Sequence, residues 1–84
     1  VPRDVQLVFT EVFSQQNIFL RELGRYSSAQ IQLGLDQATC RKYNCLLQVT
    51  PDGKDYELRL SQGGQSWFIH SKSPVPKPLS EVSR

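Results

Sequence analysis

The apolar residues at the beginning of the chain recur at the spacing of an α-helix. Between Pro2 and Leu23 they fall on one side of a helix that turns by about 100° per residue. Pro2 suits a first helical turn, and Gly24 suits a C-cap. The stripe consists of Val5, Val8, Phe9, Val12, Phe13, Phe19, Leu20 and Leu23, and Gln16 shares its face. We therefore predict one helix of roughly 20 residues, about 30 Å long, with a break near the sequence SQQN as the alternative.

After Gly24 the spacing of the apolar residues changes to a period of two. This alternation predicts half-buried strands at 29–36, 45–50, 55–61 and 66–70. The sequences PDGK at 51–54 and QGGQ at 62–65 are typical of hairpin turns. The segment 37–44 is predicted to be a polar connection. The strand residues expected to face the helix are Ile31, Leu33, Leu35, Leu47, Val49, Tyr56, Leu58 and Leu60.

A helix with one apolar stripe needs an apolar sheet face to cover it. We therefore predict an α+β fold in which one long N-terminal helix packs on one face of a four-stranded antiparallel meander, in the order α-β-β-β-β. The folded domain is predicted to span residues 1–70. Residues 71–84 contain Pro74, Pro76 and Pro78, which exclude an interior strand, so they are predicted to form a proline-rich tail or linker.

The size and composition of the chain narrow the classes of protein to which it can belong. Its 84 residues are 38% hydrophobic and 21% charged, as expected for one small globular domain. The net charge of +2 is below the basicity expected where phosphate contacts dominate binding. No apolar run is long enough to span a bilayer, so we expect no membrane insertion.

Two cysteines, Cys40 and Cys45, lie in the sequence TCRKYNC. Small secreted scaffolds usually contain more cysteines, and two thiols with the only histidine far downstream do not form a zinc site. The pair is therefore interpreted as two reduced cysteines of an intracellular protein, in the cytoplasm or the nucleus. A disulfide that closes the loop between them is the alternative.

The sequence carries no motif that indicates catalysis. Dinucleotide-binding, P-loop, serine-hydrolase and zinc-protease motifs do not occur. His70 has no recognisable Asp or Ser partner nearby in the chain, and Asp52, Asp55 and Glu57 surround a turn as solubilising charges do. We expect no enzymatic activity, no cofactor and no metal.

One helix covers one face of a sheet, and the other face is predicted to be open. Strand alternation places Trp67 and Phe68 on opposite faces, so one of them stands on the open face. Protein interfaces are enriched in aromatic side chains and Arg, so this face is interpreted as a partner-binding surface. Its predicted contacts are Trp67 or Phe68, together with Leu46, Arg59, Gln32 and Gln48. A solvated face whose aromatic side chain is shielded by the tail or a loop is the alternative.

The tail contains two short interaction signals. The sequence PVPKP provides Pro74, Pro76, Lys77 and Pro78, an extended segment with a cation of the kind that proline-recognition domains bind. Ser73, which precedes Pro74, is a candidate site of proline-directed phosphorylation. A plain interdomain linker is the alternative.

The sequence NCLLQVTPDGK at 44–54, preceded by a helix and a strand, resembles the hairpin of the small Alu-RNA-binding subunits of the signal recognition particle. Those proteins have an α-β-β-β-α fold, and the resemblance implies a small RNA-binding domain. The predicted order is also similar to that of the kinase-associated C-terminal domains. Neither resemblance transfers a site residue, and this chain lacks the strongly basic sheet and basic tail of the Alu-RNA-binding subunits.

These observations favour a non-catalytic protein–protein interaction domain, an adaptor, scaffold or dimerisation module cut from a larger regulatory protein. Its protein partner is expected to dock on the open sheet face. A homodimer is expected to form through that face or through an unpaired edge strand. RNA binding is the alternative function.

Overall fold

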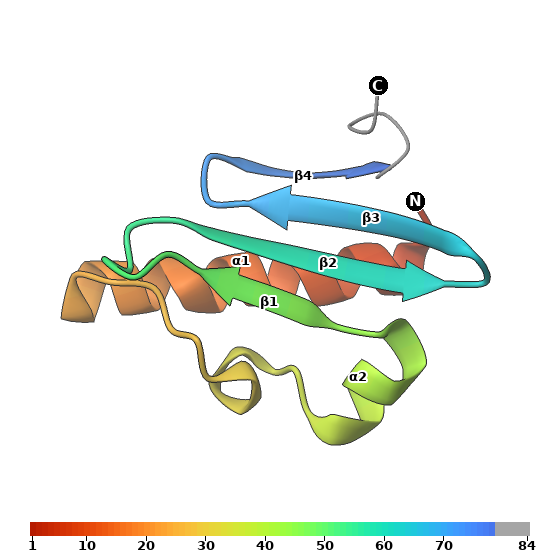
Figure 1. Cartoon of the computed structure of the whole chain (residues 1–84), viewed down its shortest axis with the longest axis horizontal. Coiled ribbons are helices and arrows are strands. Elements are labelled where there is room, and N and C mark those ends of the chain that lie inside the picture. The colour runs from red at the N-terminus through yellow and green to blue at the C-terminus, as the bar shows by residue number, and fades with distance from the viewer. Residues whose placement is uncertain (79–84) are drawn as a thin grey trace.

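The computed structural model describes residues 1–78, and the fold is the predicted α+β arrangement of a long N-terminal helix and a four-stranded antiparallel sheet (Figure 1). The helical elements are α1 (Arg3–Leu23), the short 3₁₀-helix η1 (Gln30–Leu33) and α2 (Gln37–Tyr43). The strands are β1 (Leu46–Val49), β2 (Tyr56–Gln62), β3 (Gln65–His70) and β4 (Ser73–Pro78), in the sheet order β1-β2-β3-β4. In Figure 1 α1 lies behind the sheet, so the face toward the viewer is the outer one.

The predicted amphipathic helix is confirmed, and it runs without a break through the SQQN sequence. Its buried residues are Val5, Phe9, Val12 and Gln16. Gly24 ends the helix in the left-handed conformation, with φ 75°, which glycine adopts without a steric penalty. The predicted stripe is wrong at its last member, because the Leu23 side chain lies beyond the sheet and is 68% exposed.

The predicted first strand, 29–36, is wrong. Residues Gln30–Leu33 form η1, and Gly34 follows with φ 82°. The amide of Leu35 donates to the carbonyl of Gln30 at 3.0 Å, which closes a compact turn instead of a ladder. Leu33 and Leu35 still reach the core from this turn, whereas Ile31 is 78% exposed. Two of the apolar residues that suggested alternation, Leu33 and Leu35, are therefore buried by a compact turn and not by a strand.

The segment 37–44, predicted to be a polar connection, contains α2. The side chain of Asp36 caps this helix by accepting a hydrogen bond from the amide of Thr39 at 2.8 Å. Tyr43 at the other end is buried, and its hydroxyl donates to Asp4 Oδ2 at 2.8 Å. This bond fixes α2 against the first turn of α1.

The three strands predicted within 45–70 and their hairpin turns are confirmed, with β1 pairing β2 and β2 pairing β3. In the β1–β2 turn Gly53 has φ 71°, and its carbonyl accepts the amide of Tyr26 at 2.8 Å. A Cβ atom at position 53 would lie 2.7 Å from the Cβ of Arg25. The turn therefore requires glycine both for its backbone conformation and for the close passage of the chain that leaves α1.

The fourth strand is β4, formed by Ser73–Pro78, which the sequence assigned to a tail. It lies at the sheet edge beside β3 (Figure 1), with Phe68 paired to Lys77 and His70 paired to Ser73. Its edge position agrees with the expectation that the prolines exclude an interior strand. The domain boundary predicted after residue 70 falls between two paired strands, and the end of the predicted tail, 79–84, lies outside the described residues.

The core lies between α1 and the inner face of the sheet, and η1 and α2 contribute to it. Its buried members are Val5, Phe9, Val12, Tyr26, Leu33, Leu35, Tyr43, Tyr56, Leu58, Leu60, Trp67 and Ile69. Gln16 lies among them and is fully buried. Its side-chain Nε2 donates to the Ser27 carbonyl at 2.8 Å, and its Oε1 accepts the Ser27 amide at 2.8 Å. This two-point bond satisfies both ends of the buried Gln16 amide.

Candidate interaction surface

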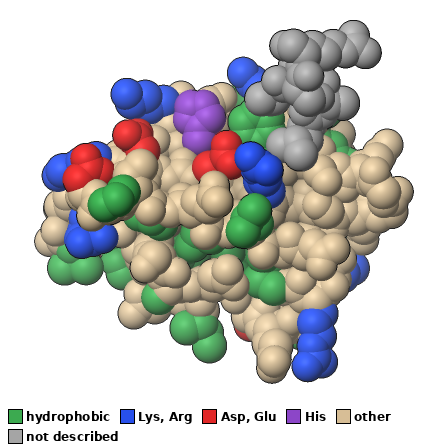
Figure 2. Space-filling view, viewed as in Figure 1, with side chains coloured by type: hydrophobic (Ala, Val, Ile, Leu, Met, Phe, Trp, Pro, Cys, Tyr) green, Lys and Arg blue, Asp and Glu red, His purple; other side chains and the backbone are tan. Residues whose placement is uncertain are grey.

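The outer face of the sheet carries two rows of side chains that cross the strands. The first row, which we call the central row, contains Leu46, Arg59, Phe68 and Lys77, one residue from each strand in register. The second row contains Gln48, Glu57, His70 and Ser73. Figure 2 shows this face, on which hydrophobic and basic side chains alternate beside the histidine and acidic side chains.

Arg59 is held in place at the middle of the central row. Its Nε lies 2.9 Å from Glu57 Oε2, and the two side chains are 42% and 32% exposed. Both residues belong to β2 and point to the same side because they are two positions apart. The guanidinium keeps its other N–H groups free of this bond, so it can donate to a partner while Glu57 fixes its position.

The structure decides which of the two neighbouring aromatic residues faces outward. Trp67 belongs to the core and is 6% exposed, so of the two aromatic residues it is not the one that stands on the open face. Phe68 points to the outer face, where Arg59 and Lys77 are its cross-strand neighbours. The Phe68 side chain is only 8% exposed, so it serves as the floor of the central row and not as a projecting anchor.

The remaining predicted contacts are divided between two regions. Leu46, 44% exposed, and the exposed Gln48 lie on β1 beside Arg59 and Glu57. Gln32 lies in η1, outside the sheet, where its Oε1 accepts the hydroxyl of Ser27 at 3.0 Å. Gln32 was placed on the sheet face only because 29–36 was predicted to be a strand.

A shallow hollow of about 420 Å³ lies at the end of the outer face, beside the β1–β2 turn. It is lined by polar residues, including Asp55, Glu57, His70 and Ser71. The hydroxyl of Ser71 donates to Asp55 Oδ1 at 2.7 Å, whereas His70 Nδ1 accepts the amide of Lys72 at 3.3 Å. His70 Nδ1 is therefore engaged by the backbone, and the hollow is lined in part by hydrogen-bond donors and acceptors. Sequence reasoning had treated these residues separately.

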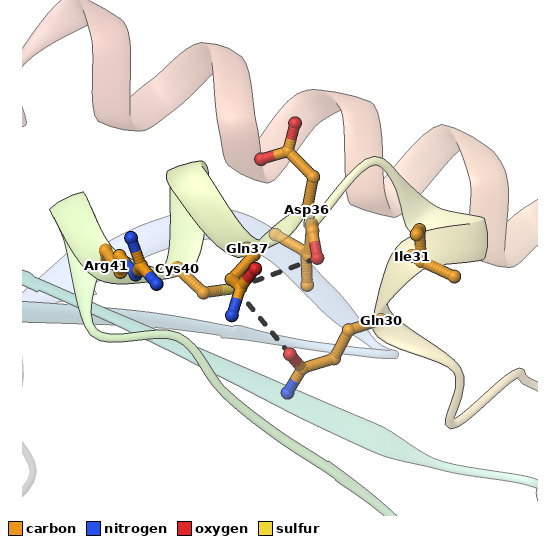
Figure 3. A pocket seen from close by; sticks show the side chains of 7 residues that line it. Gln30, Ile31, Asp36, Gln37, Cys40 and Arg41 are labelled. Atoms are coloured by element: carbon orange, nitrogen blue, oxygen red, sulfur yellow. Dashed lines mark hydrogen bonds between the residues drawn. The ribbon is translucent and has the colours of Figure 1, made fainter.

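A second hollow, of about 450 Å³, lies between η1 and α2 (Figure 3), and Cys40 is among the residues that line it. Cys40 and Cys45 form a disulfide, so the prediction of two reduced cysteines is wrong. Asn44 turns the chain with φ 50°, which brings the two Cα atoms to 4.8 Å, within the range that disulfides span. Cys40 Sγ also lies 3.6 Å from Gln30 Oε1 and 3.8 Å from the Leu35 carbonyl. Because a bridged sulfur carries no proton, these two approaches are contacts and not donated hydrogen bonds.

The predicted signals of the tail belong to an edge strand. Pro74, Pro76, Lys77 and Pro78 lie in β4, and Val75 between them is 67% exposed. Ser73 is half-buried at the start of the strand, opposite His70. A domain that recognises the proline-rich segment would therefore have to bind a strand that is paired with β3, and a kinase would have to modify Ser73 within that strand. Both functions stay predictions.

The comparisons with known proteins give no match: no family model, no curated protein and no solved structure is similar enough to assign the chain to a family. Within residues 1–78 no helix has the length and apolarity needed to cross a membrane. Over the same residues no three His, Cys, Asp or Glu side chains gather as metal ligands would.

Proposed function

We propose that this chain is a protein-interaction domain that binds its partner through the outer sheet face. The observation that supports the proposal is the central row, in which Arg59 lies between the exposed Leu46 and the Phe68 floor. An arginine flanked by apolar side chains is typical of interface centres, where its stem packs and its guanidinium forms directed hydrogen bonds. Glu57 pre-orders the guanidinium, which reduces the entropy lost on binding.

The RNA-binding alternative receives less support from the same surface. Sheets that bind single-stranded RNA stack bases on exposed aromatic rings. Phe68 is the aromatic residue of the central row, and with 8% exposure it offers no ring face to a base. Glu57 also neutralises part of the positive charge of Arg59.

The disulfide bears on where the interaction takes place. Disulfides persist in oxidising compartments and are rare in cytosolic and nuclear proteins. The expectation of a cytoplasmic or nuclear location depended on two reduced cysteines. Given the Cys40–Cys45 bridge, we propose that the domain functions in an oxidising compartment.

The experiment is an affinity capture with the immobilised domain, in nuclease-treated and untreated arms. We compare the wild type with the double variant Leu46→Ser/Arg59→Ala, which removes two exposed parts of the central row. Loss of hot-spot side chains costs about 2 kcal/mol or more, so the affinity for a captured partner should fall roughly thirtyfold.

The matched control is Leu23→Ser/Arg21→Ala, which makes the same chemical changes at the exposed end of α1. It should bind as the wild type does. Equal binding by the central-row variant and the control would overturn the proposal. Capture that disappears on nuclease treatment and falls steeply with salt would favour the RNA alternative.

A further inference from the structure

The two edges of the sheet differ in the backbone groups that they offer. The amide of Thr50 donates to the carbonyl of Asp55 at 3.0 Å, so the backbone groups of Thr50 point toward β2. In a strand these directions alternate from residue to residue. Gln48 and Leu46 therefore also bond to β2, and the N–H and C=O groups of Leu47 and Val49 point away from the sheet.

The opposite edge, on β4, has lost its outward donors. Lys77 and Ser73 are the residues in register with Phe68 and His70 of β3. The amide of Ser71 donates to the carbonyl of Tyr56 at 3.0 Å, so alternation turns the backbone groups of Phe68 and His70 toward β4. The β3–β4 register is irregular between Phe68 and His70, so the outward positions are counted from each paired residue: 76 and 78 flank Lys77, and 74 follows Ser73. All three are proline, which has no N–H group. A further strand cannot pair along this edge.

The β1 edge carries no such prolines. The sequence Leu46–Val49 contains neither a charge nor a proline, which are the usual devices against edge pairing. The amides and carbonyls of Leu47 and Val49 find no hydrogen-bond partner among the described residues outside the β1–β2 ladder. On the inner face, Leu47 and Val49 are only half-buried, whereas Leu58 and Ile69 on the neighbouring strands are fully buried. The core is thus incompletely covered along β1.

We propose that β1 is a homodimerisation edge, at which two copies of this chain pair their β1 strands antiparallel about a two-fold axis at Gln48. In this register Leu47 of one copy and Val49 of the other exchange backbone hydrogen bonds, and the symmetric pair repeats them. The half-buried Leu47 and Val49 side chains then cover one another, and the two Gln48 amides face each other on the outer side. Because β4 is closed by its prolines, the pairing joins β1 only to β1 and ends at a dimer instead of a fibre.

We assign the strand that pairs with β1 to a second copy of this chain, because β1 itself has every property that such a strand needs. It is uncharged, free of proline and apolar on alternate positions, so its two-fold image is complementary to it. This inference does not depend on the proposed partner surface, since it concerns the purified protein alone.

The test is analytical ultracentrifugation of the purified chain over rising concentration, with Gln48→Lys as the variant and Val75→Lys as the control. Gln48 is exposed, so the variant folds, but it places two like charges directly opposite in the dimer. Its dimer dissociation constant should rise about fivefold. Val75→Lys adds the same charge to the exposed β4 edge and should leave dimerisation unchanged.

Two further readouts define the register. A mixture of Gln48→Lys and Gln48→Glu should form a heterodimer at least as stable as the wild-type dimer, because the opposed charges then attract. Hydrogen exchange should show the amides of Leu47 and Val49 gaining protection with concentration, while that of Gln48 is protected throughout. A wild type that stays monomeric, a dimer indifferent to Gln48→Lys, or edge amides that exchange equally fast at every concentration would each overturn the proposal.

Discussion

Gln16 shows how a single polar residue can be required within an apolar stripe. Both ends of its amide bond to Ser27, at 2.8 Å each, and the side chain has no exposed surface. Its position on the apolar face of α1 was evident in the sequence. The reason for it was not, because Ser27 is eleven positions away, beyond the end of the helix.

We predict that Gln16→Leu lowers the free energy of unfolding by about 1–3 kcal/mol, because it leaves the half-buried amide and carbonyl of Ser27 without partners. Urea denaturation measures the change. Gln6→Leu, on the exposed side of α1, should change stability by less than about 0.5 kcal/mol. Similar losses for the two variants would show that the bond to Ser27 is not what makes Gln16 necessary.

Tyr56, unlike Gln16, is a buried residue whose polar group is not hydrogen-bonded among the described residues. Its ring packs edge-on against Tyr26, with centroids 4.7 Å apart, but its buried hydroxyl has no hydrogen-bond partner among the described residues. Burial raises the pKa of this hydroxyl above its usual value near 10. The aromatic ring, and not the hydroxyl, therefore explains why residue 56 lies in the core.

At the scale of elements, the disulfide joins α2 to the start of β1. It closes a short loop between Cys40 and Cys45, and it adjoins the hollow lined by Ile31 and Leu35. The sequence showed that the two cysteines lie five positions apart. It did not show that a helix followed by a left-handed Asn44 folds that short segment back on itself.

We predict that Cys40→Ala/Cys45→Ala lowers the free energy of unfolding by about 2 kcal/mol, the value expected from the chain entropy of so short a loop. Reductant should lower the stability of the wild type by a similar amount and leave the variant unchanged. Alkylation followed by mass spectrometry tests the bridge itself. Free thiols in native protein prepared without reductant would contradict both the bridge and the proposed oxidising compartment.

At the scale of the whole molecule, three hydrogen-bonded carboxylates make stability depend on pH. The pKa of Asp4 is lowered mainly by the Tyr43 hydroxyl, that of Asp36 by its bonds to Thr39, and that of Asp52 by the Thr50 hydroxyl. In each case the native state holds its proton less tightly than the unfolded chain, whose usual value is 3.8. Their contribution is therefore present above that pH and is lost as pH falls through the lower native values.

We predict that the urea midpoint stays level from neutral pH to about pH 5 and falls steadily below about pH 4. Asp4→Asn should make this acid dependence shallower, because one of the three linked carboxylates no longer titrates. Midpoints measured at several pH values for both proteins provide the check. An unchanged slope in Asp4→Asn would show that the bond from Tyr43 does not persist in solution.

The sequence by itself determined the long helix α1, both tight hairpins and the central strand pair β2–β3. Each of these depends on residues close together in the chain: a 3.6-residue apolar stripe, turn residues with the right backbone preferences, and alternation on either side of them. It also determined that Trp67 and Phe68 face opposite ways, since a strand allows nothing else.

Only the tertiary structure decided which of the remaining segments join the sheet and which aromatic residue is in the core. Alternation in 29–36 is compatible with a strand, but that segment buries Leu33 and Leu35 from a compact turn and leaves Ile31 in solvent. The proline-rich segment 73–78 becomes the fourth strand because a short turn returns it to the edge of β3, where outward prolines cost no ladder hydrogen bond. The spacing of apolar residues in a segment indicates which of its side chains can be buried. Whether it pairs depends on which edges the rest of the chain leaves available, and no short stretch of sequence contains that information.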